Sequence, residues 1–124
     1  MKDIEFIESC KKRTKDIAIR IINLVQKINK NDESRIISKH LLRCATSVGA
    51  NYRAACRARS QAEYYSKISI VIEELDETLF WMELLIESGI VKENMLVDLM
   101  KECNELLKIF AKSRKTLNEK FTKN

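Results

Sequence analysis

LLRCATSVGANYRAACRARSQAEYYSKISIVIEELDETLFWMELLIESGIV, residues 41–91, contains the clearest evidence for the architecture of this chain. Its apolar and small residues recur at alternating spacings of three and four, the pattern of a helix that packs lengthwise against others. Ser60 and Glu63 have the spacing of a capping box, which predicts that a new helix begins there. Gly89 follows the last periodic residue and suits the left-handed position that closes a helix. The segment therefore predicts two consecutive helices joined by a tight turn.

The same spacing continues on both sides of this segment. A polar segment rich in capping residues, 29–34, separates a first periodic segment from the second. We expect helices over about 3–29, 34–58, 60–88 and 92–119. Because all three connections are short, neighbouring helices must run antiparallel. The predicted fold is all-α, a single domain over 1–124 that forms an up-down-up-down four-helix bundle.

The second predicted helix contains two unusual positions. Its apolar seam is expected to be Ile37, Leu41, Cys44, Val48, Asn51 and Ala55. A polar Asn51 on that seam is interpreted as a selector of register or oligomeric state. Gly49 costs a helix interior about 1 kcal/mol relative to alanine, so it is expected to mark a close helix crossing or a kink.

Composition excludes several classes of protein. The 124 residues are 45% hydrophobic and 33% charged, with no proline and two glycines. No apolar run approaches the roughly 18 residues that a membrane span needs, and charges interrupt the N-terminal segment. The expected location is the cytoplasm, with no membrane partner. Three of the four cysteines, Cys10, Cys44 and Cys103, lie on apolar faces and are expected in the core.

Nothing in the sequence assembles a catalytic site or a cofactor site. No pair of the four cysteines forms a CxxC motif, and His40 is the single histidine, so a zinc site is not expected. His40 has Arg43, not glutamate, three residues away, which does not match the motif of di-metal bundles. We expect a non-enzymatic protein without metal or other cofactor.

Charge is segregated along the chain. Residues 1–60 carry 14 basic and 6 acidic side chains, residues 61–105 carry 3 basic and 11 acidic, and residues 106–124 carry 6 basic and 1 acidic. Basic clusters of this kind can bind the phosphates of RNA or DNA. The candidate nucleic-acid-binding residues are Lys11, Lys12, Arg13, Lys15, Arg53, Arg57, Arg59, Lys112, Arg114 and Lys115.

A second interpretation of the arginines is structural. Arg57 and Arg59 could instead form salt bridges with Glu73, Glu74 or Glu77 of the acidic third helix, in the same chain or a neighbouring copy. The sequence alone leaves both interpretations open. Apolar residues also cover a wide arc of the third helix between residues 80 and 86, which predicts self-association.

From Leu41 onward the chain resembles a bacterial four-helix bundle protein family whose founding members are encoded in intervening sequences of large-subunit ribosomal RNA genes. The resemblance covers residues 41–91 and, more loosely, residues 99–117. It is carried by Arg43, Ser47, Gly49, Asn51, Arg57, Glu74, Glu77 and Trp81. Many members have proline where Gly49 stands and glutamate where Ala54 stands.

The resemblance implies an up-down bundle that assembles as a homopentamer and has no established enzymatic activity. It gives Asn51, Glu74, Glu77 and Trp81 structural or assembly roles. A more distant similarity to the accessory protein of diversity-generating retroelements implies nucleic acid and a reverse transcriptase as partners. The competing hypothesis is a structural or protein-interaction module that binds no nucleic acid.

Overall fold

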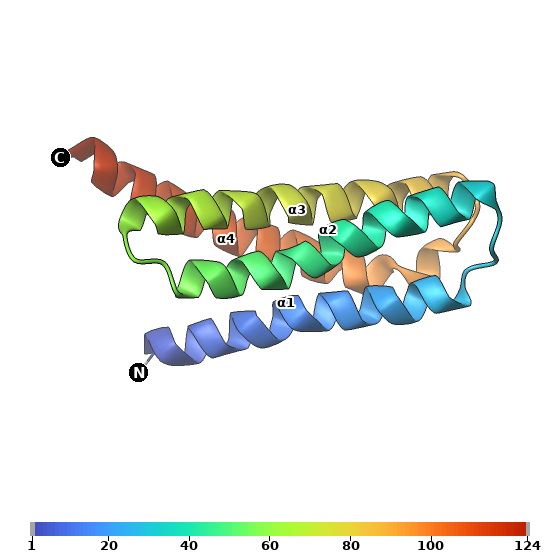
Figure 1. Ribbon diagram of the computed structural model, residues 1–124, viewed down its shortest axis with the longest axis horizontal. Helices are drawn as coiled ribbons and strands as arrows, with labels where there is room; N and C mark the ends of the chain where they lie inside the picture. Colours follow the sequence, from blue (N-terminus) through green and yellow to red (C-terminus); the bar gives the residue numbers. More distant parts are fainter. Residues whose placement is uncertain (1, 124) are drawn as a thin grey trace.

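The computed structural model describes residues 2–123 as four antiparallel helices (Figure 1). The α-helices are α1 (Lys2–Lys27), α2 (Asp32–Cys56), α3 (Gln61–Glu87) and α4 (Val97–Lys123), and a 3-10 helix, η1 (Glu93–Met95), precedes α4. Successive helices run in opposite directions, and no strand occurs within residues 2–123. The predicted all-α, up-down-up-down bundle is confirmed.

Local capping chemistry sets where α2 begins. Asn31 is the N-cap, and its side chain accepts a hydrogen bond from the backbone N–H of Ser34 at 2.9 Å. The Ser34 hydroxyl in turn accepts from the Asn31 N–H at 3.0 Å, which completes a capping box. The expected start at residue 34 was therefore two residues late, because Ser34 is the third residue of the helix and not its cap.

The ends of α3 follow the predicted signals closely. Ser60 caps the N-terminus of α3, because its hydroxyl accepts a hydrogen bond from the Glu63 N–H at 3.0 Å. The Glu63 carboxylate accepts from the Arg59 N–H and not from the Ser60 N–H, so only half of the predicted capping box forms. At the other end Gly89 has a φ of +79°, and the Ile90 N–H bonds to the Leu85 carbonyl at 3.0 Å. This is the glycine-dependent closure of a Schellman motif. Because η1 occupies the residues before it, α4 begins at Val97, five residues later than predicted.

The buried side chains form one cluster that runs the length of the bundle. Cys10, Cys44 and Cys103 are fully buried free thiols, as predicted. The α2 helix packs against both α1 and α3, whereas α1 and α4 touch only lightly. Tyr52, with 2% of its surface exposed, is the buried residue of α2 where the pattern had placed Asn51.

Gly49 marks a close crossing of α1 and α2, one of the two predicted alternatives. A Cβ atom built at Gly49 would lie 3.5 Å from backbone atoms of Thr14 and Lys15. That is ordinary van der Waals contact, so alanine fits but a longer side chain does not. The missing side chain at Gly49 therefore lets the backbones of α1 and α2 approach each other closely.

We expect Gly49→Ala to raise the free energy of unfolding by up to about 1 kcal/mol, because alanine restores helix propensity without a clash. Gly49→Leu should lower it by about 1–3 kcal/mol, since the added atoms must displace α1. Urea denaturation of the three proteins measures both effects. If Gly49→Ala were less stable than the native chain, the backbones of α1 and α2 would lie too close to accept a Cβ atom at this position.

Among residues 2–123, no helix is long and apolar enough to cross a lipid bilayer.

Candidate nucleic-acid interface and the α2–α3 polar network

A polar network joins α2 to α3 near the middle of both helices. The Arg43 guanidinium bonds to the Glu77 carboxylate and lies 3.6 Å from Oε2 of Glu74. Trp81 Nε1 donates to Glu77 at 3.2 Å, and the His40 ring stacks on Trp81 with 4.6 Å between centroids. The network thus assembles Arg43, Glu74, Glu77 and Trp81, four of the positions that carry the family resemblance. The sequence did not pair Arg43 with these acids, because 31 and 34 residues separate them.

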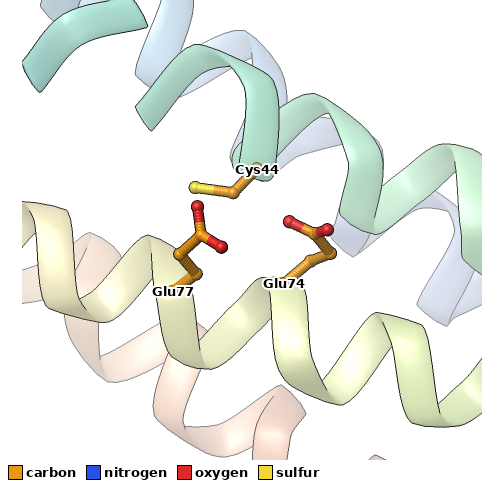
Figure 2. Close-up of side chains that lie close together, drawn as sticks. All are labelled: Cys44, Glu74 and Glu77. Atoms are coloured by element: carbon orange, nitrogen blue, oxygen red, sulfur yellow. The ribbon is translucent and has the colours of Figure 1, made fainter. Parts of the chain in front are cut away.

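The same region brings three metal-ligating groups together. Figure 2 shows the Cys44 thiol next to the Glu77 carboxylate, with the Glu74 carboxylate on its other side. One ligand atom from each of the three residues lies within 4.8 Å of the others. Burial raises the pKa of the Cys44 thiol, which keeps it protonated and weakens it as a ligand. Arg43 already supplies a positive charge to both carboxylates. The arrangement therefore fits a structural ion-pair network better than a metal centre.

Glu74 is the member of the network whose charge is least well compensated. Its Oε2 atom is buried and has no hydrogen-bond partner among the described residues, since Arg43 at 3.6 Å is too distant for one. Burial raises the pKa of Glu74 above its usual range, and Arg43 opposes that rise only in part. The ionised form is therefore disfavoured in the folded protein.

We expect Glu74→Gln to be more stable than the native chain at neutral pH, by on the order of 1 kcal/mol, because glutamine removes a buried charge that Arg43 compensates only in part. A carboxyl group whose pKa is raised in the folded state stabilises the fold at pH values below its unfolded-state pKa. That stabilisation is lost as the pH rises through the folded-state pKa. The advantage of glutamine should therefore shrink below about pH 4.3. Denaturant titrations across this range measure it. Glu77→Gln is the control, because it removes the charge that pairs with Arg43 and should be destabilised. A destabilised Glu74→Gln at neutral pH would mean that Arg43 outweighs burial.

A basic hollow lies between α1 and α2. It has a volume of about 350 Å³ and is lined by Glu8, Lys11, Lys12, Lys15 and Arg53. Lys12, Lys15 and Arg53 are exposed, and Lys11 forms an ion pair with Glu8 at 3.1 Å. The structure thus brings two of the predicted basic clusters into one site. Glu8 was missed, although its position three residues before Lys11 is the spacing of an ion pair on one helix face.

Arg13 does not belong to the basic hollow. Its side chain points to α4, where Nε and Nη2 donate to the two carboxylate oxygens of Glu102 at 2.8 and 2.7 Å. Nη2 also lies 3.2 Å from Glu105. The hydrogen bond from Arg13 lowers the pKa of Glu102. The structure therefore corrects the grouping of Arg13 with its lysine neighbours, because it occupies the α1–α4 face of the helix.

We expect Arg13→Met to lower the free energy of unfolding by about 1–2 kcal/mol at neutral pH, because a bidentate charged pair is lost while the apolar stem is kept. A carboxyl group such as Glu102, whose pKa is lowered in the folded state, stabilises the fold at pH values above its unfolded-state pKa. That stabilisation is lost as the pH falls through the folded-state pKa. The stabilities of the native chain and the Arg13→Met variant should therefore converge well below the ordinary glutamate pKa of about 4.3. Chemical denaturation at neutral and at acidic pH tests this, and a deficit that persists in acid would contradict it.

Arg57 and Arg59, which follow α2, do not reach the middle of the acidic helix α3. Arg57 is the exposed C-cap of α2, and Arg59 is exposed with Glu63 at 3.7 Å. Within the described side chains of one chain, neither pairs with Glu73, Glu74 or Glu77. Within one chain, Arg43 takes the position facing Glu74 and Glu77, and Arg59 pairs instead with Glu63 at the start of α3. A salt bridge between Arg57 or Arg59 and a neighbouring copy stays a prediction.

The other predicted residues are dispersed. Lys112 and Lys115 are exposed on α4, and Arg114 is half-buried with Nη1 at 3.5 Å from the Ser69 hydroxyl. None of the three lines the basic hollow. Asn51 is half-buried, and its amide donates to the Ser47 hydroxyl and carbonyl at 2.8 and 3.0 Å. Its amide N–H groups are therefore satisfied within its own helix, and its role in assembly stays a prediction.

An exposed aromatic edge adjoins the polar network. Phe80 is 52% exposed and contacts the half-buried Trp81 edge-on, with 4.9 Å between ring centroids. Met82 and Leu85, by contrast, are buried in the core. Only part of the apolar arc predicted for 80–86 is therefore available to a partner.

The chain matches known proteins in sequence pattern and in structure. A family model described as 23S rRNA-intervening sequence protein matches residues 9–112. The crystal structure of a protein with unknown function from the S23 ribosomal protein family of Bacteroides thetaiotaomicron VPI-5482 is 31% identical, with a TM-score of 0.80. That match covers 86% of this chain and 98% of the other. No curated protein of the set compared matches the chain.

Proposed function

Because the chain belongs to the 23S rRNA-intervening sequence protein family, we propose that it is a non-enzymatic, homo-oligomeric adaptor that binds structured RNA in the cytoplasm. The observation that carries the proposal is the basic hollow, in which Lys11, Lys12 and Lys15 of α1 converge with Arg53 of α2. Lysine and arginine neutralise phosphates, and the binding energy of these contacts is independent of the base sequence.

The charge distribution supports RNA over a purely internal role for these residues. Glu8 is the single acidic side chain lining the hollow. Among the described side chains, no ion pair joins Lys12, Lys15 or Arg53 to an acidic group. An anionic partner would therefore meet basic groups that the chain itself leaves uncompensated.

Self-association belongs to the proposal because it multiplies a single weak site. One hollow with four basic side chains supplies few phosphate contacts, but several copies held in one assembly bind together with much greater avidity. The exposed Phe80 edge offers apolar surface for contact between copies. The expected assembly is a pentamer, and a reverse transcriptase is a candidate protein partner, both on the strength of the family resemblance. Light scattering that gives the 14.5 kDa of one chain would contradict self-association.

The experiment is a salt titration of RNA binding. Binding of a structured RNA hairpin is measured by fluorescence anisotropy. The logarithm of the association constant should fall linearly with the logarithm of the salt concentration, with a slope of about −0.9 for each phosphate contact. An assembly whose copies together make about ten contacts would lose several orders of magnitude in affinity between about 50 and 200 mM salt. Absence of a complex at low salt and tens of micromolar protein would contradict the proposal.

A protein-interaction module without nucleic-acid binding is the second candidate. The exposed aromatic edge favours it, since Phe80 and Trp81 are residue types enriched in protein interfaces. The same titration separates the two candidates, because an interaction module would leave the RNA unbound at every salt concentration.

A further inference from the structure

A second hollow lies between the N-terminal part of α1 and the C-terminal part of α4. Figure 1 shows that α1 begins and α4 ends at the same end of the bundle. Its volume is about 560 Å³, larger than that of the basic hollow. Apolar and aromatic side chains from all four helices form its wall: Phe6, Ile7, Tyr52, Cys56, Tyr64 and Leu117. We call it the aromatic hollow.

The aromatic side chains of this hollow are held at different depths. Tyr52 forms the floor, with 2% of its surface exposed and its ring packed against Phe110 at 5.0 Å. Tyr64 is half-buried in the wall. Phe6 lies one turn before the fully buried Cys10 on the same helix face, yet 45% of it is exposed. An aromatic ring on the core side of α1 thus faces an open space that this chain does not fill.

Polar groups surround the mouth of the aromatic hollow. Asp3 can accept hydrogen bonds, Arg59 can donate them, and the Gln61 amide can do both. All three side chains are exposed, so each can exchange water for a hydrogen bond to a ligand. They suit a flat, partly polar ring with donors and acceptors on its edge.

The aromatic hollow lies next to the basic hollow along the α1–α2 seam. Ile7 of the first is followed by Glu8 and Lys11 of the second, so about 6 Å of helix axis separates Ile7 from Lys11. On α2, Cys56 of the first lies three residues after Arg53 of the second. An apolar slot and a phosphate-binding cluster are therefore adjacent on one face.

We propose that the aromatic hollow receives an unpaired base of RNA, while Lys11, Lys15 and Arg53 hold the neighbouring phosphate. The inference rests on the proposed function and adds which part of an RNA is recognised. A base within a duplex does not enter the hollow, because it is paired with its partner and stacked between its neighbours, and extruding it costs free energy. Loops and single strands present bases that stack on aromatic side chains and expose their hydrogen-bonding edges.

The test compares a short single-stranded RNA, about 12 nucleotides and so within the usual range of single-strand site sizes, with a duplex of the same sequence. Both are titrated against the full chain at fixed salt. Phe6→Ala removes the exposed ring, and Ala58→Trp fills the hollow from the α2–α3 connection. Each should weaken single-strand binding by about 5- to 100-fold, the scale of one lost stacking contact, and leave duplex binding unchanged.

A fluorescent base gives a second measurement. The base analogue 2-aminopurine, placed in the single strand, should be quenched by the native chain and not by the Ala58→Trp variant. Thermal unfolding confirms that both variants are folded.

The outcomes separate this inference from the proposed function. Equal affinities for both RNAs, unaffected by either variant, overturn the base-binding hollow while binding through the basic hollow stands. No binding of either RNA overturns both proposals. If Phe6→Ala or Ala58→Trp changes the mass of the assembly and leaves both RNA affinities unchanged, the hollow is a contact between copies and the inference is wrong.

Discussion

Replacing Lys12 and Lys15 together by glutamate is expected to weaken RNA binding by on the order of 10- to 100-fold, because each reversal removes a phosphate contact and adds a repulsion. Both side chains are exposed, and both line the basic hollow. The slope of log affinity against log salt should decrease by about 2 for each bound copy, one for each lost contact. Anisotropy titrations at three or more salt concentrations measure affinity and slope together.

A matched control keeps the change in net charge and moves its location. Lys27 and Lys92 are exposed and lie at the other end of the bundle, where α1 leads to α2 and α3 leads to α4. Lys27→Glu with Lys92→Glu should reduce affinity only slightly, through the general field of the protein. Equal losses in both double variants would show that net charge, rather than the basic hollow, attracts the RNA.

Phe110→Ala is expected to cause the largest loss of stability, about 3–5 kcal/mol, the range for removing a buried aromatic ring. Phe110 is 1% exposed and is the largest fully buried side chain. Its ring packs on Tyr52, so the substitution opens a cavity between α2 and α4 and removes the support of the aromatic hollow. Because a domain of this size has a total stability of about 5–15 kcal/mol, a large fraction would be lost.

Urea denaturation measures this effect, with Leu117→Ala as the comparison. Leu117 lies two turns farther along α4 and is half-buried, so its truncation should cost much less. Similar losses for the two variants would contradict the position of Phe110 at the centre of the core. Phe110→Leu, which keeps most of the apolar volume, should recover a large part of the stability.

The assembly of several copies would change how these stabilities are measured. If folding and association are coupled, the midpoint of unfolding depends on protein concentration, because the bound copies stabilise the folded chain. The comparisons above therefore require equal concentrations. A concentration-dependent midpoint would itself support self-association.

The helices and their antiparallel order could be predicted from the amino-acid sequence. Spacing of apolar residues identifies the buried face of each helix, and the capping signals at Ser60 and Gly89 act within a few residues. These are local effects, so one sequence suffices to detect them. The same reasoning failed at Asn51, because two neighbouring positions on a helix differ by only about 100° and Tyr52 is the one that turns inward.

Which charged residues are free became visible only in three dimensions. Arg13 pairs with Glu102, 89 residues away, whereas Lys12, Lys15 and Arg53 face a shared hollow. Such pairing depends on the rotation of each helix about its axis and on which helices are neighbours, and neither is encoded in a local spacing. The aromatic hollow likewise exists only where the ends of four helices meet, because no single helix carries enough of its wall to reveal it.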